Sequence, residues 1–293
     1  MPNMSKRAFF AAVAAAALTM SLSACGGADS STSSPTGSRA MRYELVQSGV
    51  VTAATLSTQP PFAMTDKDGA PTGFAVDLMN EAAKRLHVKV QYKTTDLAGV
   101  LSGLTAGRYD IGVGGFGATP ERKRHVSFTA PYYWGTTAVV TKKSDKQSRL
   151  SDFDGKRVGV VSGAVQEAFI AKKMPKAKAV QFKDQTALIS QLLSGGIDAM
   201  VLGGADAEVY VAKQPVRIAV SADSTQGTGF PLRKNGDPKF LSDIDAQINE
   251  MIDDGTYVKL YRKYFNEPVA ASLLKERPNL KQQVAGTDLA PKG

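Results

Sequence analysis

The sequence predicts an α/β protein built from two similar lobes with one cleft between them. The first observation is an internal sequence repeat, which we call the echo. Residues 89–115 (KVQYKTTDLAGVLSGLTAGRYDIGVGG) resemble residues 179–203 (AVQFKDQTALISQLLSGGIDAMVLG). Each copy reads as strand, helix and strand, and such units build parallel sheets flanked by helices. The second observation is that both copies end in glycine, at Gly115 and Gly203. Because ligands lie beyond the carboxyl ends of strands in open α/β sheets, the two lobes are expected to face one cleft.

The echo continues through the helix and the turn of each copy. Apolar residues recur at helical spacing, namely Val100, Leu101 and Leu104 in the first copy and Leu188, Ile189 and Leu192 in the second. Gly107 and Gly195 follow as helix stops, and Asp110 and Asp198 then precede the last strand. An ordered series of this kind indicates a structural repeat, not a chance match.

The rest of the chain supplies the remaining elements of two lobes. Strands are expected at residues 50–56, 136–141 and 157–161, and helices at residues 77–86, 166–172 and 241–265. The β-rich run TTAVVT at 136–141 is where the chain crosses to the second lobe, and the glycine-containing residues 225–232 form the expected return crossing.

These crossings set the predicted domain boundaries. Lobe 1 comprises residues 42–137 and 225–265, and lobe 2 comprises residues 138–224. Residues 266–293 are polar and contain prolines, so they are expected to form a loosely attached tail.

The amino terminus reads as an export signal followed by a tether. Lys6 and Arg7 precede an apolar run at residues 8–22, which has the length of a secretory h-region. The run ends in Leu-Ser-Ala-Cys, which resembles a bacterial lipobox, and Cys25 is the only cysteine of the chain. Residues 1–24 are therefore expected to be a signal peptide, with a lipid on Cys25 as anchor at the membrane surface. An ordinary signal peptide beside an unmodified cysteine is the alternative.

Residues 25–41 contain little apolar material, which is typical of a flexible tether.

Over the whole chain of 293 residues, 43% are hydrophobic and 22% are charged, an ordinary balance for globular domains. The formal charge is +9, but no basic face interleaved with aromatics is visible, so nucleic acid is not an expected partner. His87 and His125 have no partner at a ligand spacing, so no metal site or hydrolytic triad is indicated.

The stretch GVGGFG at residues 112–117 matches the dinucleotide pattern G-x-G-x-x-G. A dinucleotide site also needs a long helix directly afterwards and an acid about 20 residues further on. Here Ala118, Thr119 and Pro120 follow, and the residues around 137 are Thr-Thr-Ala-Val. The match is therefore accidental, and no cofactor is expected.

Arg122 is the strongest candidate for a ligand contact. Thr119 is placed as an N-cap and Pro120 as the first helical residue, which sets Arg122 in the first turn of a short helix. A planar guanidinium binds a carboxylate with two hydrogen bonds. A surface salt bridge is the alternative, and it is the interpretation adopted for Lys123 and Arg124.

Five motifs give the chain a family resemblance over residues 44–265. They are LVQSGVVTAATLSTQPPF, GAPTGFAVDLMNEAAKRL, LTAGRYDIGVGGFGATPERKRHVSFTAPYY, GKRVGVVSGAVQEAF and LLSGGIDAMV. In this order they resemble the family 3 solute-binding proteins, the extracytoplasmic receptors of polar amino acid ABC transporters. The resemblance implies a type II periplasmic-binding-protein-like fold with two hinge-crossing strands. It also implies a monomer that closes over a ligand and delivers it to a permease with its ATPase.

The resemblance also assigns the residues of a ligand site. Arg122 would bind the ligand's α-carboxylate. Phe62 and Phe116 would form walls of the cleft, and Gln59 and Leu97 would lie beside the ligand's side chain.

Several positions depart from the family's pattern. Gly115 and Gly117 stand where the family usually carries polar groups, and Ala164 and Val165, after Gly163, stand where it usually has Thr or Ser. Gly203 matches an Asp that takes the ligand's ammonium.

These departures predict a small carboxylate ligand whose amino group, if present, is held unusually. The glycines are expected to leave extra space for a larger ligand. Asp206 could replace the acid missing at Gly203, or it could serve only as a helix start.

Two functions of other classes remain open. A few relatives of this fold are dehydratases that act on cyclohexadienyl acids, and Glu167 is the nearest candidate acid, although the sequence favours a binding protein without enzymatic activity. A receptor that senses its ligand without transport is the other alternative.

Overall fold

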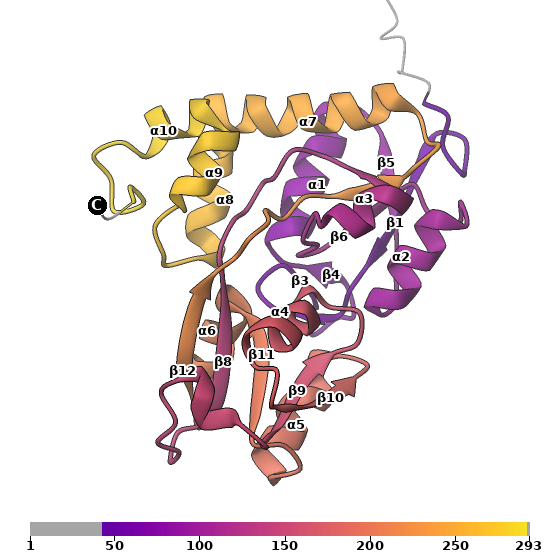
Figure 1. The fold of residues 1–293 in the computed structure, drawn as a ribbon. Coiled ribbons are helices and arrows are strands. Elements are labelled where there is room, and N and C mark those ends of the chain that lie inside the picture. The colour runs from indigo at the N-terminus through magenta and orange to yellow at the C-terminus, as the bar shows by residue number, and fades with distance from the viewer. Residues whose placement is uncertain (1–42, 292–293) are drawn as a thin grey trace, which may run out of the picture. The chain divides into compact units, whose positions relative to one another are not determined.

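The computed structural model describes residues 43–291. The predicted signal peptide, the lipidation site at Cys25 and the tether lie outside the described residues. In the part described, the chain forms two five-stranded sheets flanked by helices and a small three-stranded sheet (Figure 1). We call the parts built on the first and second five-stranded sheets lobe 1 and lobe 2. Between residues 43 and 291, no helix is long and apolar enough to cross a membrane.

Lobe 1 has the strand order β5-β1-β6-β13-β7. Its strands are β1 (Val50–Thr55), β5 (Lys89–Thr94), β6 (Ile111–Val113), β7 (Val126–Phe128) and β13 (Pro231–Arg233). Its helices are α1 (Phe74–Arg85), α2 (Leu97–Thr105), α3 (Pro120–His125), α7 (Pro238–Asp253) and α8 (Thr256–Tyr264). The small sheet consists of β2 (Thr58–Gln59), β3 (Ala63–Thr65) and β4 (Pro71–Thr72). The core of lobe 1 is rich in aromatic residues contributed by α1, α8 and the segment after β7.

Lobe 2 has the strand order β10-β9-β11-β8-β12. Its strands are β8 (Thr136–Lys142), β9 (Arg157–Val161), β10 (Lys178–Phe182), β11 (Ala199–Gly203) and β12 (Val216–Asp223). Its helices are α4 (Val165–Lys173), α5 (Gln185–Ser194), α6 (Gly204–Lys213) and a short 3-10 helix, Leu150–Phe153. Apolar clusters on both faces of the sheet bury its strands.

The structure confirms the internal echo. In lobe 1, β1 runs parallel to its neighbours β5 and β6, and in lobe 2, β9 runs parallel to its neighbours β10 and β11. The echoed aspartates have matching contacts, because an Asp110 carboxylate oxygen accepts the Thr52 N–H at 2.8 Å and an Asp198 oxygen accepts the Arg157 N–H at 2.8 Å. Asp110 therefore ties the start of β6 to β1, and Asp198 ties the start of β11 to β9.

Two adjacent chain segments cross between the lobes, one before β8 and one after β12 (Figure 1). The Tyr132 N–H donates to the Thr228 carbonyl oxygen at 2.8 Å, and the Thr228 N–H donates to the Tyr133 carbonyl oxygen at 2.8 Å. The Trp134 indole N–H donates to the Ser224 carbonyl oxygen at 3.0 Å. The expected fold of two α/β lobes joined by two crossing segments is thus present. The run 136–141, which was expected to form the first crossing, instead belongs to β8 of the lobe 2 sheet, and the chain crosses just before it.

The expectation of a loosely attached tail is wrong for residues 266–291. This segment forms α9 (Ala271–Glu276) and α10 (Pro278–Val284), which lie against lobe 1. Its apolar residues are few, but they are buried in the lobe 1 core, namely Val269, Leu273, Leu280, Val284 and Leu289. A low apolar content therefore did not prevent packing, because these five side chains are buried in the lobe 1 core.

Candidate functional site

A cavity of about 230 Å³ lies between the lobes and is lined by residues of both. The predicted ligand-binding residues that line it are Gln59, Phe62, Leu97, Gly115, Phe116, Gly117, Arg122, Ala164, Val165, Gly203 and Asp206. Gly163 is not among the lining residues, but its carbonyl oxygen accepts a hydrogen bond from Arg122. The structure therefore brings the predicted residues together, and their role in binding stays a prediction.

Arg122 is placed as the local sequence predicts. The Thr119 hydroxyl accepts the Arg122 backbone N–H at 3.1 Å, and Pro120 is the first residue of α3. The guanidinium donates to the carbonyl oxygen of Gly117 at 3.0 Å and to that of Gly163 at 2.9 Å. Gly163 belongs to lobe 2, so this side chain bridges the two lobes at the cavity wall.

The Arg122 guanidinium is a half-buried cation without a carboxylate partner. No Asp or Glu among residues 43–291 lies within salt-bridge distance of it, whereas the neighbouring Arg124 pairs with Glu121 at 3.6 Å. Burial lowers the pKa of Arg122 to about 10, which still leaves it charged at neutral pH. A desolvated cation at a cavity wall favours binding of an anion there.

The amino end of α4 faces the same cavity from lobe 2. Its N-cap residue is Ala164, which has no side chain that could accept the first N–H groups of the helix. The first N–H groups of a helix have no partner within it and form its positive end. The N–H of Val165, the first helical residue, is therefore a second donor at this cavity that is suited to an anion.

The spaces beside Gly115 and Gly117 are filled by side chains from other elements. A β-carbon on Gly115 would lie 2.8 Å from the Gln59 amide nitrogen. That amide donates to the Gly115 carbonyl oxygen at 3.1 Å and accepts the Gly115 N–H at 2.8 Å. A β-carbon on Gly117 would lie 3.1 Å from Val165 and 3.4 Å from Gln226.

The space beside Gly203 is filled by Asp206. A β-carbon on Gly203 would lie 2.5 Å from an Asp206 carboxylate oxygen. The backbone of Gly203 has a φ of −64°, which any residue adopts, so the limit on a side chain there is space. The expectation that glycines enlarge the site is therefore wrong at Gly115, Gly117 and Gly203, because other side chains occupy the space.

Asp206 and Gln185 form a buried polar wall in lobe 2. Asp206 is 3% exposed, and one carboxylate oxygen accepts a hydrogen bond from the Gln185 side chain at 2.6 Å. Burial raises the pKa of Asp206 to about 7. The other amide atom, Gln185 Oε1, is buried and has no hydrogen-bond partner in the described part of the chain. This wall therefore offers acceptors for a donor inside the cavity.

The backbone carbonyls of the glycine stretch are less available as acceptors. The Gly114 oxygen accepts the Tyr132 hydroxyl, the Gly115 oxygen accepts the Gln59 amide, and the Gly117 oxygen accepts Arg122. An ammonium group in the cavity would therefore find its best acceptors at Asp206 and Gln185.

Aromatic rings form the apolar wall of the cavity in lobe 1. The rings of Phe62 and Tyr133 meet edge to face with centroids 4.9 Å apart, and both residues line the cavity. Phe116 also lines it, but is 1% exposed and packs in a lobe 1 cluster with Val100 and Leu104.

Gln185 and Gln226 are site residues that sequence reasoning missed. Gln185 was detectable from the repeat, because Asp184 caps α5 as Asp96 caps α2, which makes Gln185 the counterpart of Leu97. Gln226 lies in the return crossing and lines the cavity, and no local pattern marks its side chain.

Comparison with known proteins identifies the family. The model of the bacterial extracellular solute-binding proteins, family 3, matches residues 51–267. A probable histidine-binding protein of Neisseria gonorrhoeae is 29% identical over 90% of this chain and 96% of its own length. The histidine-binding periplasmic protein of Salmonella typhimurium is 32% identical over 71% of this chain and 85% of its own.

Solved structures of amino-acid-binding proteins are also similar to this chain. An ancestral arginine-binding protein bound to arginine is 34% identical, with a TM-score of 0.71 over 74% of this chain and 99% of its own. The ancestral amino acid-binding protein AncCDT-1, a precursor of cyclohexadienyl dehydratase, is 33% identical, with a TM-score of 0.68 over 74% and 96%. The two-lobed fold is thus of the type II periplasmic-binding class. The chain belongs to the family 3 bacterial extracellular solute-binding proteins.

Proposed function

We propose that this protein is the extracytoplasmic binding component of an ABC importer for an amino acid or a related small carboxylate. It would capture the ligand by closure of the two lobes and deliver it to a permease. The observation that carries the proposal is the Arg122 guanidinium, which lies at the wall of an interlobe cavity and has no carboxylate partner among residues 43–291. The family of the chain and the amino acids named for its relatives support the same conclusion.

The proposed binding mode divides the ligand between the lobes. Its carboxylate would contact Arg122 of lobe 1 and the N–H of Val165 at the start of α4 in lobe 2. Its amino group would contact Asp206 and Gln185 of lobe 2. A ligand held from both sides stabilises the closed arrangement over the open one, which is how binding drives closure.

The remaining contacts and the cavity size favour a small ligand. Its side chain would lie against Phe62, Leu97 and Gln59, which combine an apolar wall with one amide. The volume of about 230 Å³ lies below the range of about 300–1,000 Å³ that is typical of sites for drug-sized ligands.

A binding screen tests the proposal. Purified protein would be titrated calorimetrically with the standard amino acids, their keto acids and small dicarboxylates, and its melting temperature followed in parallel. A ligand at 100 times its Kd is expected to stabilise the protein by about 2.7 kcal/mol. Arg122→Ala is expected to abolish the gain. The matched control is Arg124→Ala on the same helix, because Arg124 contacts Glu121 and does not line the cavity. Equal binding by wild type and Arg122→Ala would contradict the proposal.

We also propose that the chain is exported and held at the membrane by a lipid on Cys25. The support is the lipobox-like run that precedes the only cysteine of the chain. Mass spectrometry of the mature protein should find a lipidated amino-terminal cysteine. Cys25→Ser should move the protein from the membrane fraction to the soluble fraction, and recovery of the variant with membranes would contradict the anchor.

One observation favours a second candidate, a dehydratase that acts on a cyclohexadienyl acid. Asp206 is a buried cavity-wall carboxyl whose pKa of about 7 suits a general acid. Glu167 is not among the residues that line the cavity, and its carboxylate accepts the Gly163 N–H at 3.1 Å and the Gln181 amide at 2.8 Å. Incubation with a cyclohexadienyl acid should give an aromatic product by absorbance if this activity exists, and Asp206→Asn should abolish it.

A further inference from the structure

The segment 267–289 begins at the last residue that the family model matches, so residues 268–289 lie outside that match. It nevertheless packs on lobe 1, with α10 against α7. The segment also contacts the chain that crosses from lobe 1 to lobe 2, through Arg277 and, at its start, through Glu267.

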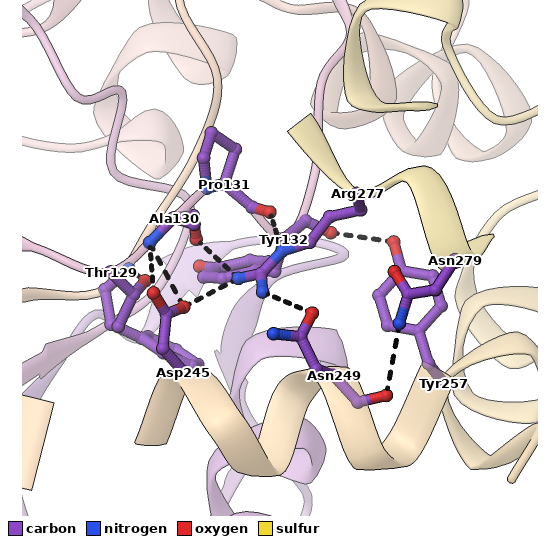
Figure 2. A network of polar contacts seen from close by, with 10 residues as sticks. Thr129, Ala130, Pro131, Tyr132, Asp245, Asn249, Tyr257, Arg277 and Asn279 are labelled. Carbon is purple, nitrogen blue, oxygen red and sulfur yellow. Dashed lines mark hydrogen bonds and ion pairs between the residues drawn. The ribbon is translucent and has the colours of Figure 1, made fainter. Parts of the chain in front are cut away.

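Arg277 binds the backbone of Ala130 and Pro131, the two residues that precede Tyr132 (Figure 2). Its side chain is 3% exposed and donates to the carbonyl oxygens of Ala130 and Pro131, both at 3.0 Å. It also donates to an Asp245 carboxylate oxygen at 2.7 Å and to the Asn249 side-chain oxygen at 2.8 Å. The guanidinium thus connects α7 to residues 130–131 through four hydrogen bonds that use all three of its nitrogen atoms.

The backbone that Arg277 holds leads directly to the ligand cavity. Tyr132 follows, and its hydroxyl donates to the Gly114 carbonyl oxygen, next to cavity-lining Gly115. Its N–H bonds to Thr228 of the return crossing at 2.8 Å. Tyr133, the next residue, lines the cavity itself. A shift of residues 130–131 would therefore displace the cavity residues Gly115 and Tyr133. It would also disturb the hydrogen bond from Tyr132 to Thr228, which joins the two crossing segments.

A second contact comes from the start of the same C-terminal segment. A Glu267 carboxylate oxygen accepts the Tyr133 hydroxyl at 2.5 Å. Tyr133 is 5% exposed, so this bond fixes the direction of a ring that forms part of the cavity wall.

We propose that residues 267–289 form a hinge brace, in which Arg277 is a positioning residue for the crossing segments and for the ligand cavity. The brace holds residues 130–133 against lobe 1 and confines hinge motion to the residues that follow, Trp134 and Gly135, and to the return crossing. Its importance for ligand capture rests on the proposed function, but its effect on the hinge is measurable without ligand.

The informative substitution is Arg277→Lys. Lysine keeps a positive charge beside Asp245, but its ammonium cannot reproduce a planar fork that reaches two backbone carbonyls and two side chains at once. The matched control is Leu280→Ala on α10, because Leu280 is fully buried in the same segment and packs in the lobe 1 core. Both variants are expected to lower the melting temperature, but only the loss of Arg277 should loosen the crossing.

The readouts are amide hydrogen exchange at Tyr132 and Thr228 and fluorescence of Trp134, the only tryptophan of the chain. In Arg277→Lys, exchange at these amides should accelerate about tenfold relative to amides of β9 and β11, which is about 1.4 kcal/mol of local stability. Acrylamide should also quench Trp134 more strongly. In Leu280→Ala, exchange at Tyr132 and Thr228 relative to β9 and β11 should stay within about twofold of wild type.

Equal effects of the two substitutions at Tyr132, Thr228 and Trp134 would overturn the brace. If Arg277→Lys does not fold, Asp245→Asn takes its place, since it keeps the geometry but weakens the charged contact to Arg277, and the same selective acceleration is expected. Because these measurements use ligand-free protein, they can fail independently of the binding screen. If the protein binds no amino acid but Arg277→Lys still accelerates exchange selectively at Tyr132 and Thr228, the proposed function is contradicted and the hinge brace is supported.

Discussion

At the scale of single residues, the site combines glycines with polar side chains that reach in from elsewhere. Gln59 of β2 fills the space at Gly115, and Asp206 of α6 fills the space at Gly203. If either glycine carried a side chain, that side chain would overlap with Gln59 or Asp206, and one of the two would have to move. Each glycine and the side chain beside it are therefore expected to depend on one another energetically.

The pair Gly203 and Asp206 tests this dependence. Gly203→Ala would put a β-carbon 2.5 Å from an Asp206 carboxylate oxygen, which forces one of them to move. Overpacking of this kind typically lowers the free energy of unfolding by about 1–3 kcal/mol. In an Asp206→Ala background the same substitution should be nearly neutral. Urea unfolding of wild type, both single variants and the double variant measures the coupling, and additive effects would contradict the structural account.

Asp206 also predicts how binding depends on pH. Burial raises its pKa to about 7 from an ordinary value near 4, so the stability that its neutral form contributes is fully present below pH 4 and is lost as the pH rises through 7. A bound ammonium group needs the ionised form. Affinity for an amino acid should therefore fall about tenfold for each pH unit below 7, while the melting temperature of ligand-free protein should rise.

Asp206→Asn is the control for this prediction. The variant should bind an amino acid more weakly at pH 8 and lose most of the dependence between pH 5.5 and pH 8. Calorimetry in buffers of different ionisation enthalpy would detect the proton that wild type releases on binding near pH 6. An unchanged pH profile in Asp206→Asn would assign the dependence to another group.

The residues of the site were predictable where a local motif places them. Thr119 and Pro120 start a helix by their own chemistry, so the position of Arg122 followed from four consecutive residues. Contacts such as Gln226 beside Gly117 depend on how a distant segment crosses the cavity, and no local pattern carries that information.

At the scale of elements, periodicity predicted the repeated strand–helix–strand units and the longer helices, but not α6, β7 or β12, and it did not fix where most elements begin and end. The strand at Arg157–Val161 was predicted with its exact bounds, whereas α1 begins at Phe74, three residues before its expected start. Gly73 precedes it with a φ of 126° and packs so closely on the Phe62 backbone that a β-carbon would lie 2.4 Å from its carbonyl oxygen. That start depends on a tertiary contact, as does the packing of α9 and α10.

The amino end of α4 gives an element-scale prediction. Val165→Pro removes the N–H proposed to contact the carboxylate, yet proline is favoured at the first position of a helix. Ala164 already has an extended backbone, with φ −73° and ψ 153°, which suits a residue before proline. The variant should therefore fold and lose about 1.5–3 kcal/mol of binding free energy, the value of a hydrogen bond to a charged group.

Val165→Ala is the matched control, because it keeps the N–H and removes the methyl groups. Calorimetric titration with the best amino acid of the binding screen compares the two variants. Equal affinities would show that the α4 N–H does not contact the carboxylate.

The echoed aspartates predict unequal contributions to stability. The Asp110 side chain is 1% exposed, pairs with Arg233 at 3.4 Å, and accepts the N–H groups of Thr52 and Val46 at 2.8 Å each. Asp198 is 33% exposed and pairs with Arg157 at 3.5 Å. Asp110→Ala should therefore lower the free energy of unfolding by about 3–5 kcal/mol, as for a broken buried pair, and Asp198→Ala by less than half as much. Urea unfolding measures both, and similar losses would contradict the role of burial.

At the scale of the whole described chain, the two lobes are connected by the two crossing segments and by the Arg122 side chain. The guanidinium bonds to a carbonyl oxygen in each lobe, at Gly117 and Gly163. A ligand carboxylate that takes over these donors would exchange a direct bridge between the lobes for one that includes the ligand. Binding should therefore change the relation between the lobes, and the crossings are where the chain must adjust.

Trp134 makes this change visible, because it is the only tryptophan and its indole N–H bonds the Ser224 carbonyl oxygen of the other crossing at 3.0 Å. Adding the best amino acid of the screen should shift Trp134 emission with a midpoint equal to the calorimetric Kd. Arg124→Ala should keep this response, whereas Arg122→Ala should show none at the same concentration. Heat of binding without any change in Trp134 emission would mean that the ligand binds while the crossings stay as they are, and closure would then not accompany capture.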